Sequence, residues 1–217
     1  MKRHLIIGAS GGIGSAIAQT IEGEVVTLSR SESGLDVTDE ASITRAFATL
    51  DGTFDTIFVA TGSLTAGGEP EKTVKSLTPE TLTAQFQVNA MGPALILKHA
   101  IPFLPRDRRA VFAALSARVG SIGDNQIGGW HSYRASKSAL NQLIHSAAIE
   151  LARTHKQAIC VVLHPGTVET QFTAKYAGHH KTVPAPQAAQ NLISVMDGLT
   201  TAQTGQFFDY AGHAIPW

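Results

Sequence analysis

The amino-acid sequence predicts an α/β protein with a single doubly wound domain, in which a mostly parallel sheet of about seven strands carries helices on both faces. Short apolar runs alternate with segments of helical periodicity along all 217 residues, an order typical of parallel sheets built from right-handed crossovers. A glycine-rich turn separates the first apolar run from the first helical segment. Because no linker, repeat or low-complexity stretch interrupts the pattern, residues 1–217 are expected to form one domain.

The expected strands are apolar runs that end at glycine or polar residues. Six of them can be placed, at residues 5–8, 25–28, 56–60, 110–115, 158–163 and 206–210. Between them apolar residues recur at helical spacing, which predicts helices that begin near Ile13, after the cap Asp39, and at residues 79, 132 and 185. The helix of residues 79–104 is expected to be interrupted at Gly92 and Pro93.

Composition excludes several classes of protein. The 17 basic and 17 acidic residues balance, so the chain is not expected to bind nucleic acid or an anionic membrane. The only cysteine, Cys160, lies in an apolar run and cannot form an internal disulfide. The apolar run near the N-terminus is too short for a signal peptide, and no stretch reaches membrane-spanning length. These observations favour a cytoplasmic protein.

The glycine turn reads GASGGIG from Gly8 to Gly14 and predicts a dinucleotide site. Gly8 permits a sharp exit from the strand, Gly12 lets the backbone approach a pyrophosphate, and Gly14 permits close packing of helix on sheet. Ser10 and Ile13 lie within the same turn, at the start of a helix whose N-terminus attracts phosphate. The alternative is a structural turn that binds nothing.

The end of the second expected strand predicts which dinucleotide is bound. An acidic residue there would bind the ribose 2′-hydroxyl of NAD, but the chain has Ser29 and Arg30. A guanidinium can hold a 2′-phosphate, so NADP (NADPH) is favoured and NAD remains possible. Asp36 can accept a hydrogen bond from an adenine amino group, or it can serve as an ordinary turn residue.

Tyr133 and Lys137 lie four residues apart in the expected helix of residues 132–155, so their side chains share one face. A tyrosine ordinarily loses its proton near about pH 10. A neighbouring ammonium is expected to lower that pKa, because it favours the phenolate. The pair therefore predicts a tyrosine that exchanges a proton with a carbonyl oxygen or an alcohol near neutral pH.

Taken together, these motifs resemble the short-chain dehydrogenase/reductase family, whose members have a Rossmann-type fold, and the resemblance covers nearly the whole chain. The sequence YRASKSALN that begins at Tyr133 is most similar to the C-factor and sniffer-like carbonyl reductase branch. The motifs that carry the resemblance are Gly8-x3-Gly12-x-Gly14, Asp36-Val37, Asn89, Tyr133-x3-Lys137 and His164-Pro165-Gly166-Thr167-Val168-x-Thr170.

The resemblance implies roles for these residues. Tyr133 would be the general acid or base, and Lys137 would hold the ribose of the nicotinamide. Asn89 would join a proton relay, although it can also simply cap or kink its helix. The resemblance also implies a small-molecule carbonyl or alcohol substrate and a homodimer or homotetramer that pairs through helices 79–104 and 132–155. The implied cofactor-binding residues further include Val37, Ala60, Thr61, Gly62, Pro165, Gly166, Val168 and Thr170.

The chain departs from the family pattern at two places. Where relatives carry a serine that binds the substrate carbonyl, this chain aligns Ala117, one residue after Ser116. A one-residue offset is expected to turn Ser116 away. Either an irregular strand end brings it back as a catalytic hydroxyl, or another donor such as Ser121 replaces it, or the substrate carbonyl is only weakly polarised. At Val59-Ala60-Thr61-Gly62 the chain lacks the two asparagines that relatives often carry before that glycine, and with them side-chain hydrogen bonds that brace the central strands.

The sequence therefore predicts an NAD(P)-dependent oxidoreductase, NADPH favoured, that transfers hydride between the nicotinamide and a carbonyl or alcohol. A nucleotide-binding sensor with little turnover is the alternative. A nucleotide-sugar epimerase or dehydratase is disfavoured because 217 residues leave little room for a sugar-binding subdomain. The pair His179 and His180 has no cysteine or carboxylate at ligand spacing, so no metal site is expected. His131 is a candidate for the lining of the substrate cleft, or it is simply packed.

Overall fold

A computed structural model of the chain describes residues 1–170 and 182–217. Its main sheet has six parallel strands in the order β2-β1-β3-β4-β5-β8. The order reverses between β1 and β3, and open α/β sheets bind ligands at such a point. The strands are β1 (Arg3–Ile7), β2 (Glu24–Leu28), β3 (Thr56–Val59), β4 (Ala110–Leu115), β5 (Ala158–His164) and β8 (Phe207–Asp209).

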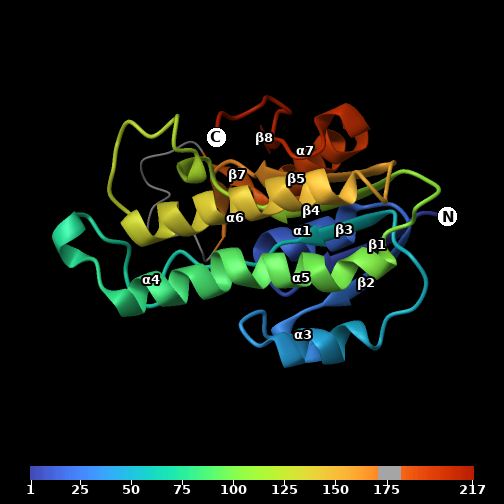
Figure 1. The fold of residues 1–217 in the computed structure, drawn as a ribbon, viewed down its shortest axis with the longest axis horizontal. Helices are drawn as coiled ribbons and strands as arrows, with labels where there is room; N and C mark the ends of the chain where they lie inside the picture. The colour runs from blue at the N-terminus through green and yellow to red at the C-terminus, as the bar shows by residue number, and fades with distance from the viewer. Residues whose placement is uncertain (171–181) are drawn as a thin grey trace.

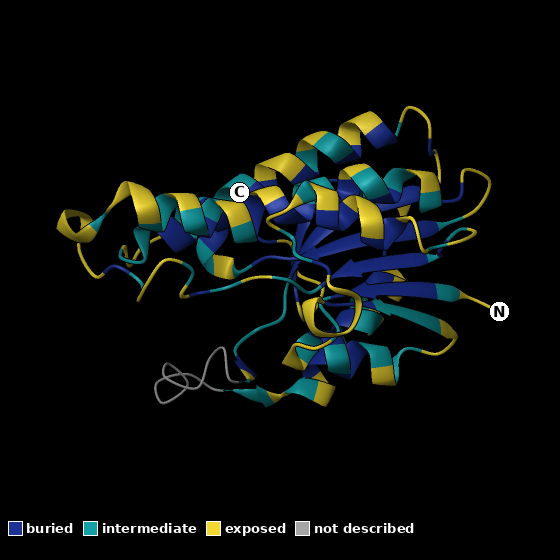
Figure 2. Ribbon diagram, turned by 90° about the horizontal axis from the view of Figure 1, so that it is seen from below, coloured by how far each residue is buried: buried dark blue, intermediate teal, exposed yellow. Residues whose placement is uncertain are grey.

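Helices cover both faces of this sheet, as expected (Figures 1 and 2). On one face α1 (Gly12–Thr20) and α7 (Ala185–Gly198) pack on one set of strand side chains. The other face is covered by α3 (Glu40–Phe47), α5 (Gly92–Ala100) and α6 (His131–Leu151). Successive strand residues enter opposite cores: Phe112 and Ala114 face α6, whereas Val111 and Ala113 face α7.

All six expected strand positions form strands, but the described residues of the main sheet contain six strands rather than about seven. Between β2 and β3 the chain forms the short helix α2 (Arg30–Ser33) and then α3, which begins at the cap Asp39 as expected. A separate two-stranded sheet pairs β6 (Val168–Glu169) with β7 (Val183–Pro184). None of the described helices is long and apolar enough to cross a membrane.

The expected helix of residues 79–104 is interrupted one turn earlier than the sequence indicated. It consists of α4 (Pro79–Phe86), the π-helix η2 (Gln87–Met91), α5, and the short 3-10 helix η3 (Ile101–Phe103). Pro93 lies in the first turn of α5, where its missing N–H costs little. The wider π turn carries Asn89, and single π turns of this kind are frequent at functional sites.

The long helix α6 begins at His131, directly after Trp130, whose φ of 50° is left-handed. Along α6 the side chains of Leu140, Ile144 and Ala148 face the sheet core. Tyr133 and Lys137 are buried near the start of the same helix. Burial on the sheet therefore fixes which face of α6 presents the two residues.

We expect Gly14→Ala to lower the free energy of unfolding by about 1–3 kcal/mol, because its Cβ would have to displace backbone. That Cβ would lie 2.3 Å from the Gly8 carbonyl oxygen. Gly198→Ala is the control: it lies at the end of α7, its Cβ would meet nothing within 4 Å, and it is expected to be neutral or stabilising by up to about 1 kcal/mol. Urea denaturation measures both, and equal stability of the two variants would contradict the prediction.

Candidate active site

The glycine turn closes tightly between β1 and α1. Gly8 adopts a φ of 87° and its N–H donates to the Leu28 carbonyl at 2.8 Å. A Cβ at Gly8 would lie 3.1 Å from the Ala60 backbone, and a Cβ at Gly14 would collide with Gly8. The turn thus needs glycine at both places, which agrees with the roles expected from the sequence.

The part of the turn that is expected to bind phosphate is exposed and lies beside the loop that follows β5. Ser10 and Gly12 are exposed, Ile13 is half-buried, and no side chain caps the N-terminus of α1 at Gly11. A Cβ at Gly12 would lie 2.7 Å from the Thr170 Cγ2, so Thr170 lies against the turn. The structure therefore brings together two segments that the sequence placed 158 residues apart.

At the end of β2, Ser29 caps the short helix α2 by accepting a hydrogen bond from the Glu32 N–H at 3.3 Å. Arg30 is exposed as the first residue of that helix. Asp36 is half-buried and its Oδ1 accepts hydrogen bonds from the Thr38 N–H at 2.8 Å and hydroxyl at 2.7 Å. These bonds lower the pKa of Asp36, and the Arg30 charge adds to the effect.

The segment after β3 forms the wall beside the glycine turn. Ala60 donates its N–H to the Ile7 carbonyl at 2.7 Å. Thr61 is half-buried, and its buried hydroxyl finds no hydrogen-bond partner in the described structure. Val37 packs against Gly92, where a Cβ would lie 2.9 Å from the Val37 Cβ.

Tyr133 and Lys137 lie on one face of α6 and are 5% and 3% exposed. The Lys137 Nζ donates to the Leu115 carbonyl oxygen, at the end of β4, at 2.9 Å. A Cβ at Gly62 would lie 3.3 Å from that Nζ and 3.2 Å from the Asn89 Oδ1. Gly62 itself is exposed, so the lysine and the asparagine converge beside an accessible backbone position.

The expected lowering of the Tyr133 pKa is not found in this structure. Burial raises the pKa of Tyr133 well above its ordinary value, and burial lowers the pKa of Lys137 to about 7. Desolvation disfavours both charged forms, and the Lys137 ammonium points to the Leu115 carbonyl. The phenol is therefore protonated at neutral pH.

Asn89 connects three segments through its side-chain amide. Its Oδ1 accepts from the Ser63 N–H at 2.8 Å, and its Nδ2 donates to the Ser63 carbonyl at 2.8 Å. The same Nδ2 donates to the Gln85 Oε1 at 2.5 Å and to the Ser136 Oγ at 3.3 Å. Asn89 is 0% exposed, so these bonds tie the loop after β3 to α6. A water relay through Asn89 stays a prediction.

Ser116 faces α6, but its hydroxyl lies away from the start of that helix. It donates to the Asn141 Oδ1 at 2.6 Å. Asn141 is eight residues after Tyr133 and so lies about 12 Å further along the helix axis. Ser121 is 1% exposed and donates its hydroxyl to the Pro216 carbonyl at 2.5 Å. Both candidate hydroxyls are thus engaged by other groups, and a catalytic role for Ser116 stays a prediction.

The loop after β5 presents the remaining expected residues. Pro165 and Gly166 are half-buried, and Gly166 has a φ of 77°. A Cβ at Gly166 would lie 2.9 Å from the Tyr210 Cδ1, so a side chain there would have to displace that ring. Val168 is 2% exposed and pairs with Val183. The expected histidine pair, His179 and His180, lies outside the described residues.

Comparisons with known proteins agree with this geometry. The family model of short-chain dehydrogenases whose description reads enoyl-(acyl carrier protein) reductase matches residues 15–204. The chain belongs to the short-chain dehydrogenase/reductase family. The family expected from the motifs is therefore confirmed.

Two curated proteins are similar to this short-chain dehydrogenase/reductase in sequence. C-signal of Myxococcus xanthus is 36% identical over 132 residues, which cover 61% of this chain and 76% of C-signal. The 1-hydroxy-2-glutathionyl-2-methyl-3-butene dehydrogenase of Rhodococcus sp. (strain AD45) is 29% identical over the full length of both chains.

Solved structures of the family share the fold. Carbonyl reductase Sniffer of D. melanogaster matches with a TM-score of 0.84 and 22% identity, over 100% of both chains. A putative short-chain dehydrogenase/reductase from Burkholderia multivorans with bound NADP matches with a TM-score of 0.81 and 24% identity, over 100% of this chain and 99% of that one.

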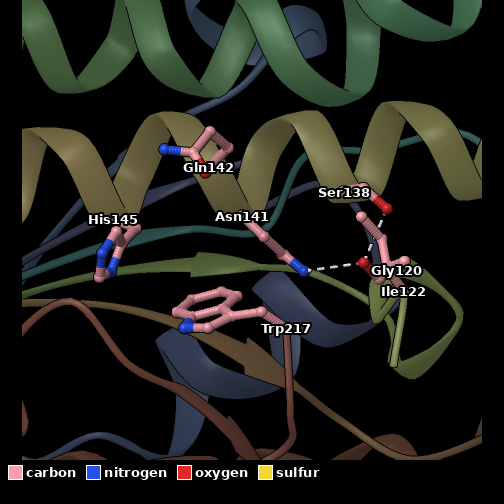
Figure 3. A pocket seen from close by; sticks show the side chains of 7 residues that line it. All are labelled: Gly120, Ile122, Ser138, Asn141, Gln142, His145 and Trp217. Carbon is pink, nitrogen blue, oxygen red and sulfur yellow. Dashed lines mark hydrogen bonds between the residues drawn. The ribbon is translucent and has the colours of Figure 1, made fainter. Parts of the chain in front are cut away.

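A pocket of about 230 Å³ lies between α6, the loop after β4 and the C-terminal residue (Figure 3). Its walls come from α6, the loop after β4 and the C-terminal Trp217, and neither Tyr133 nor Lys137 lines it. Asn141 and Ser138 both donate to the Gly120 carbonyl there, at 3.2 and 2.8 Å. These bonds anchor the loop after β4 on α6.

The sequence did not identify two residues that support the site. Gln85 is 2% exposed and accepts a hydrogen bond from Asn89, and its own amide donates to the Leu64 carbonyl at 2.8 Å. Asn141 joins Ser116 to the loop after β4. The spacing of four residues between Gln85 and Asn89, like that between Lys137 and Asn141, is the signal that predicts such neighbours on one helix face.

We expect the free energy of unfolding to rise between about pH 7 and pH 9. In this range Lys137 loses its proton in the folded chain but keeps it in the unfolded chain. Its folded pKa of about 7 lies below the unfolded value, so the unfolded chain binds more protons in this window. The buried histidines with lowered pKa, such as His164, titrate below it. Lys137→Met is expected to flatten the rise, and the exposed Lys75→Met to keep it. Thermal unfolding by circular dichroism measures this, and equal slopes would contradict it.

Proposed function

We propose that the protein is an NADPH-dependent carbonyl reductase or alcohol dehydrogenase of the short-chain type. The main observation behind the proposal is that Tyr133, Lys137 and Asn89 lie close together at the carboxyl end of the sheet. This place lies beside the reversal of strand order, where dinucleotides bind in such sheets. The proposal is further supported by the oxidoreductase family to which the chain belongs.

The residues present fit a dinucleotide. The glycine turn offers exposed backbone at the N-terminus of α1, and a Cβ at Gly12 would fill the space against Thr170. The unpaired hydroxyl of Thr61 and the exposed Gly62 lie on the segment next to it. In this proposal the pyrophosphate binds at the turn, and Pro165, Gly166 and Val168 hold the nicotinamide end.

The preference for NADPH rests on Arg30, whose guanidinium stands at the end of β2 where NAD-binding proteins carry an acidic residue. The relatives support it, because solved structures of a carbonyl reductase from chicken fatty liver and of the Burkholderia multivorans protein hold NADPH and NADP. The Ser29 that caps α2 fixes the first turn on which Arg30 stands.

The protein's own residues supply orientation and proton transfer in this mechanism. Bound NADPH would supply hydride to the carbonyl carbon. Tyr133 would donate its phenolic proton to the carbonyl oxygen, and its burial favours this step because the phenol stays protonated at neutral pH. Lys137 would turn from the Leu115 carbonyl to the ribose hydroxyls and stabilise the phenolate that forms.

The substrate we propose is a small or loosely selected carbonyl compound. The segment between Thr170 and Pro184 is short for a loop that would cover a substrate bound beside Tyr133. Most of this segment lies outside the described residues. A panel of aldehydes, ketones and quinones with NADPH tests this part of the proposal. Strict selectivity for one bulky substrate would contradict it.

Tyr133→Phe is expected to lower kcat by about 10²–10⁴-fold, because the proton donor is removed. The affinity for NADPH is expected to stay unchanged, since the ring keeps its shape and its buried position. Steady-state reduction of a carbonyl substrate and titration of NADPH fluorescence provide the two measurements.

The same two measurements on the wild-type chain distinguish the proposed enzyme from a nucleotide-binding sensor. The engaged hydroxyls of Ser116 and Ser121 favour the sensor, because neither is shown beside Tyr133 to polarise a carbonyl. A wild-type chain that binds NADPH tightly but reduces no member of the panel would refute the reductase and favour the sensor.

Arg30→Ala is expected to weaken the binding of NADPH by about tenfold to a hundredfold. This is the effect of losing one hydrogen bond between the charged guanidinium and the 2′-phosphate. The affinity for NADH should not change, because NADH lacks the 2′-phosphate. Arg45→Ala on α3 is the matched control, since its side chain is 71% exposed and its partner Asp39 lies on the surface. Fluorescence titration with both nucleotides measures this, and equal losses for NADPH and NADH would overturn the role of Arg30.

The expected homodimer or homotetramer stays a prediction. The two helical segments that were expected to pair carry exposed apolar side chains. These are Met91 of η2 and Leu143 and Ile149 of α6, which are 51%, 42% and 53% exposed.

A further inference from the structure

A buried carboxylate holds the first turn of the helix that carries Tyr133. Glu71 lies in the loop between β3 and α4 and is 5% exposed. Its side chain accepts hydrogen bonds from the Ser132 N–H at 3.2 Å and from the Ser132 hydroxyl. Its carbonyl oxygen accepts from the Trp130 N–H at 2.5 Å. Glu71 therefore contacts the start of α6 with both its main chain and its side chain.

The turn that Glu71 contacts is strained. Trp130 is the only residue other than glycine with a positive φ among residues 1–170 and 182–217, at 50°. A bulky residue in this region costs about 1–3 kcal/mol and persists only where its surroundings hold it. In this conformation the Trp130 indole lies edge-on to the Tyr133 ring, with the ring centroids 6.3 Å apart and the planes at 70°. The strained turn thus places a large side chain against the phenol.

Glu71 carries a negative charge at the N-terminus of α6, where such a charge is stabilising. Burial acts to raise the pKa of this carboxyl, but hydrogen bonds from Ser132, from its own backbone N–H and from Thr81 outweigh burial and leave the pKa below its ordinary value. Glu71 is therefore ionised at neutral pH. A carboxylate at the N-terminus of a helix interacts favourably with the unpaired N–H groups of the first turn, so α6 is stabilised where it begins.

We propose that Glu71 is a positioning residue for Tyr133: its carboxylate fixes the turn at Trp130 and Ser132, and this turn sets the orientation of the phenol toward the substrate. The inference rests on the proposed reductase function. Glu71 contacts neither the glycine turn nor Arg30, so it acts on proton transfer and not on nucleotide binding.

The kinetic test compares two substitutions in the full chain. Glu71→Ala removes every side-chain contact and is expected to lower kcat by about a hundredfold, as small misplacements of reacting groups do. Glu71→Gln keeps the size and one acceptor oxygen but removes the charge, so an intermediate loss is expected. The Kd for NADPH should stay unchanged in both. Glu80→Gln, an exposed carboxylate in the first turn of α4, is the matched control and should match the wild type.

A spectroscopic test examines the turn directly. The chain has two tryptophans, so Trp217→Phe leaves Trp130 as the only one. In that background Glu71→Ala is expected to increase acrylamide quenching of Trp130 at a temperature well below the Tm, and Glu71→Gln to increase it less. A role limited to overall stability would lower the Tm without changing quenching or kcat below the Tm.

The outcomes separate this inference from the proposed function. Loss of kcat with increased quenching and unchanged NADPH binding supports the positioning role. Unchanged quenching and kcat in Glu71→Ala, in a wild-type background that reduces carbonyls, overturns the role of Glu71 and leaves the reductase intact. A wild type that shows no turnover with the panel refutes the proposed function and the positioning role together.

Discussion

The site depends on the burial of an ammonium group at the carboxyl end of β4. Lys137 is held there by the carbonyl of Leu115, in a place where desolvation lowers its pKa to about 7. An isolated buried charge is costly, so the surrounding segments must supply polar groups or a ligand that compensates. Gly62 lies near both the Nζ and Asn89, because a Cβ there would be 3.3 Å from the Nζ and 3.2 Å from the Asn89 Oδ1. Tyr133 shares the face of α6 with Lys137, and packing of Leu140 on the sheet sets that face.

Close approach of backbone segments makes this arrangement possible. Gly120 packs directly on α6, where a Cβ would lie 2.8 Å from the Lys137 Cβ. Gly92 packs on Val37 and joins the start of α5 to the loop after β2. Together with Gly14 these positions let helices lie closer to strands and loops than any side chain would allow. The packing of these glycines therefore helps to set where Lys137 and the loop after β4 lie relative to each other.

Much of the fold followed from local patterns. The six strand positions followed from continuous apolar runs, the cap at Asp39 from its residue type, and the burial of the α6 face that carries Leu140 from the period of 3.6 residues. The π turn at Asn89 could not be predicted, because no local periodicity indicates it and the Ser63 to which Asn89 is hydrogen-bonded lies 26 residues away in the chain. Likewise, the protonation of Tyr133 depends on its burial, which spacing along a helix does not reveal.

The sequence by itself determined the order of strands and helices, the glycine turn, and the pair Tyr133 and Lys137, because each depends on residues that are near one another in the chain. The tertiary structure alone decided that Thr170 lies against Gly12 and that the Ser116 hydroxyl is bound by Asn141. Those contacts join segments far apart in the sequence, and their geometry is set by how helices pack on the sheet. Local patterns carry no information about such distances.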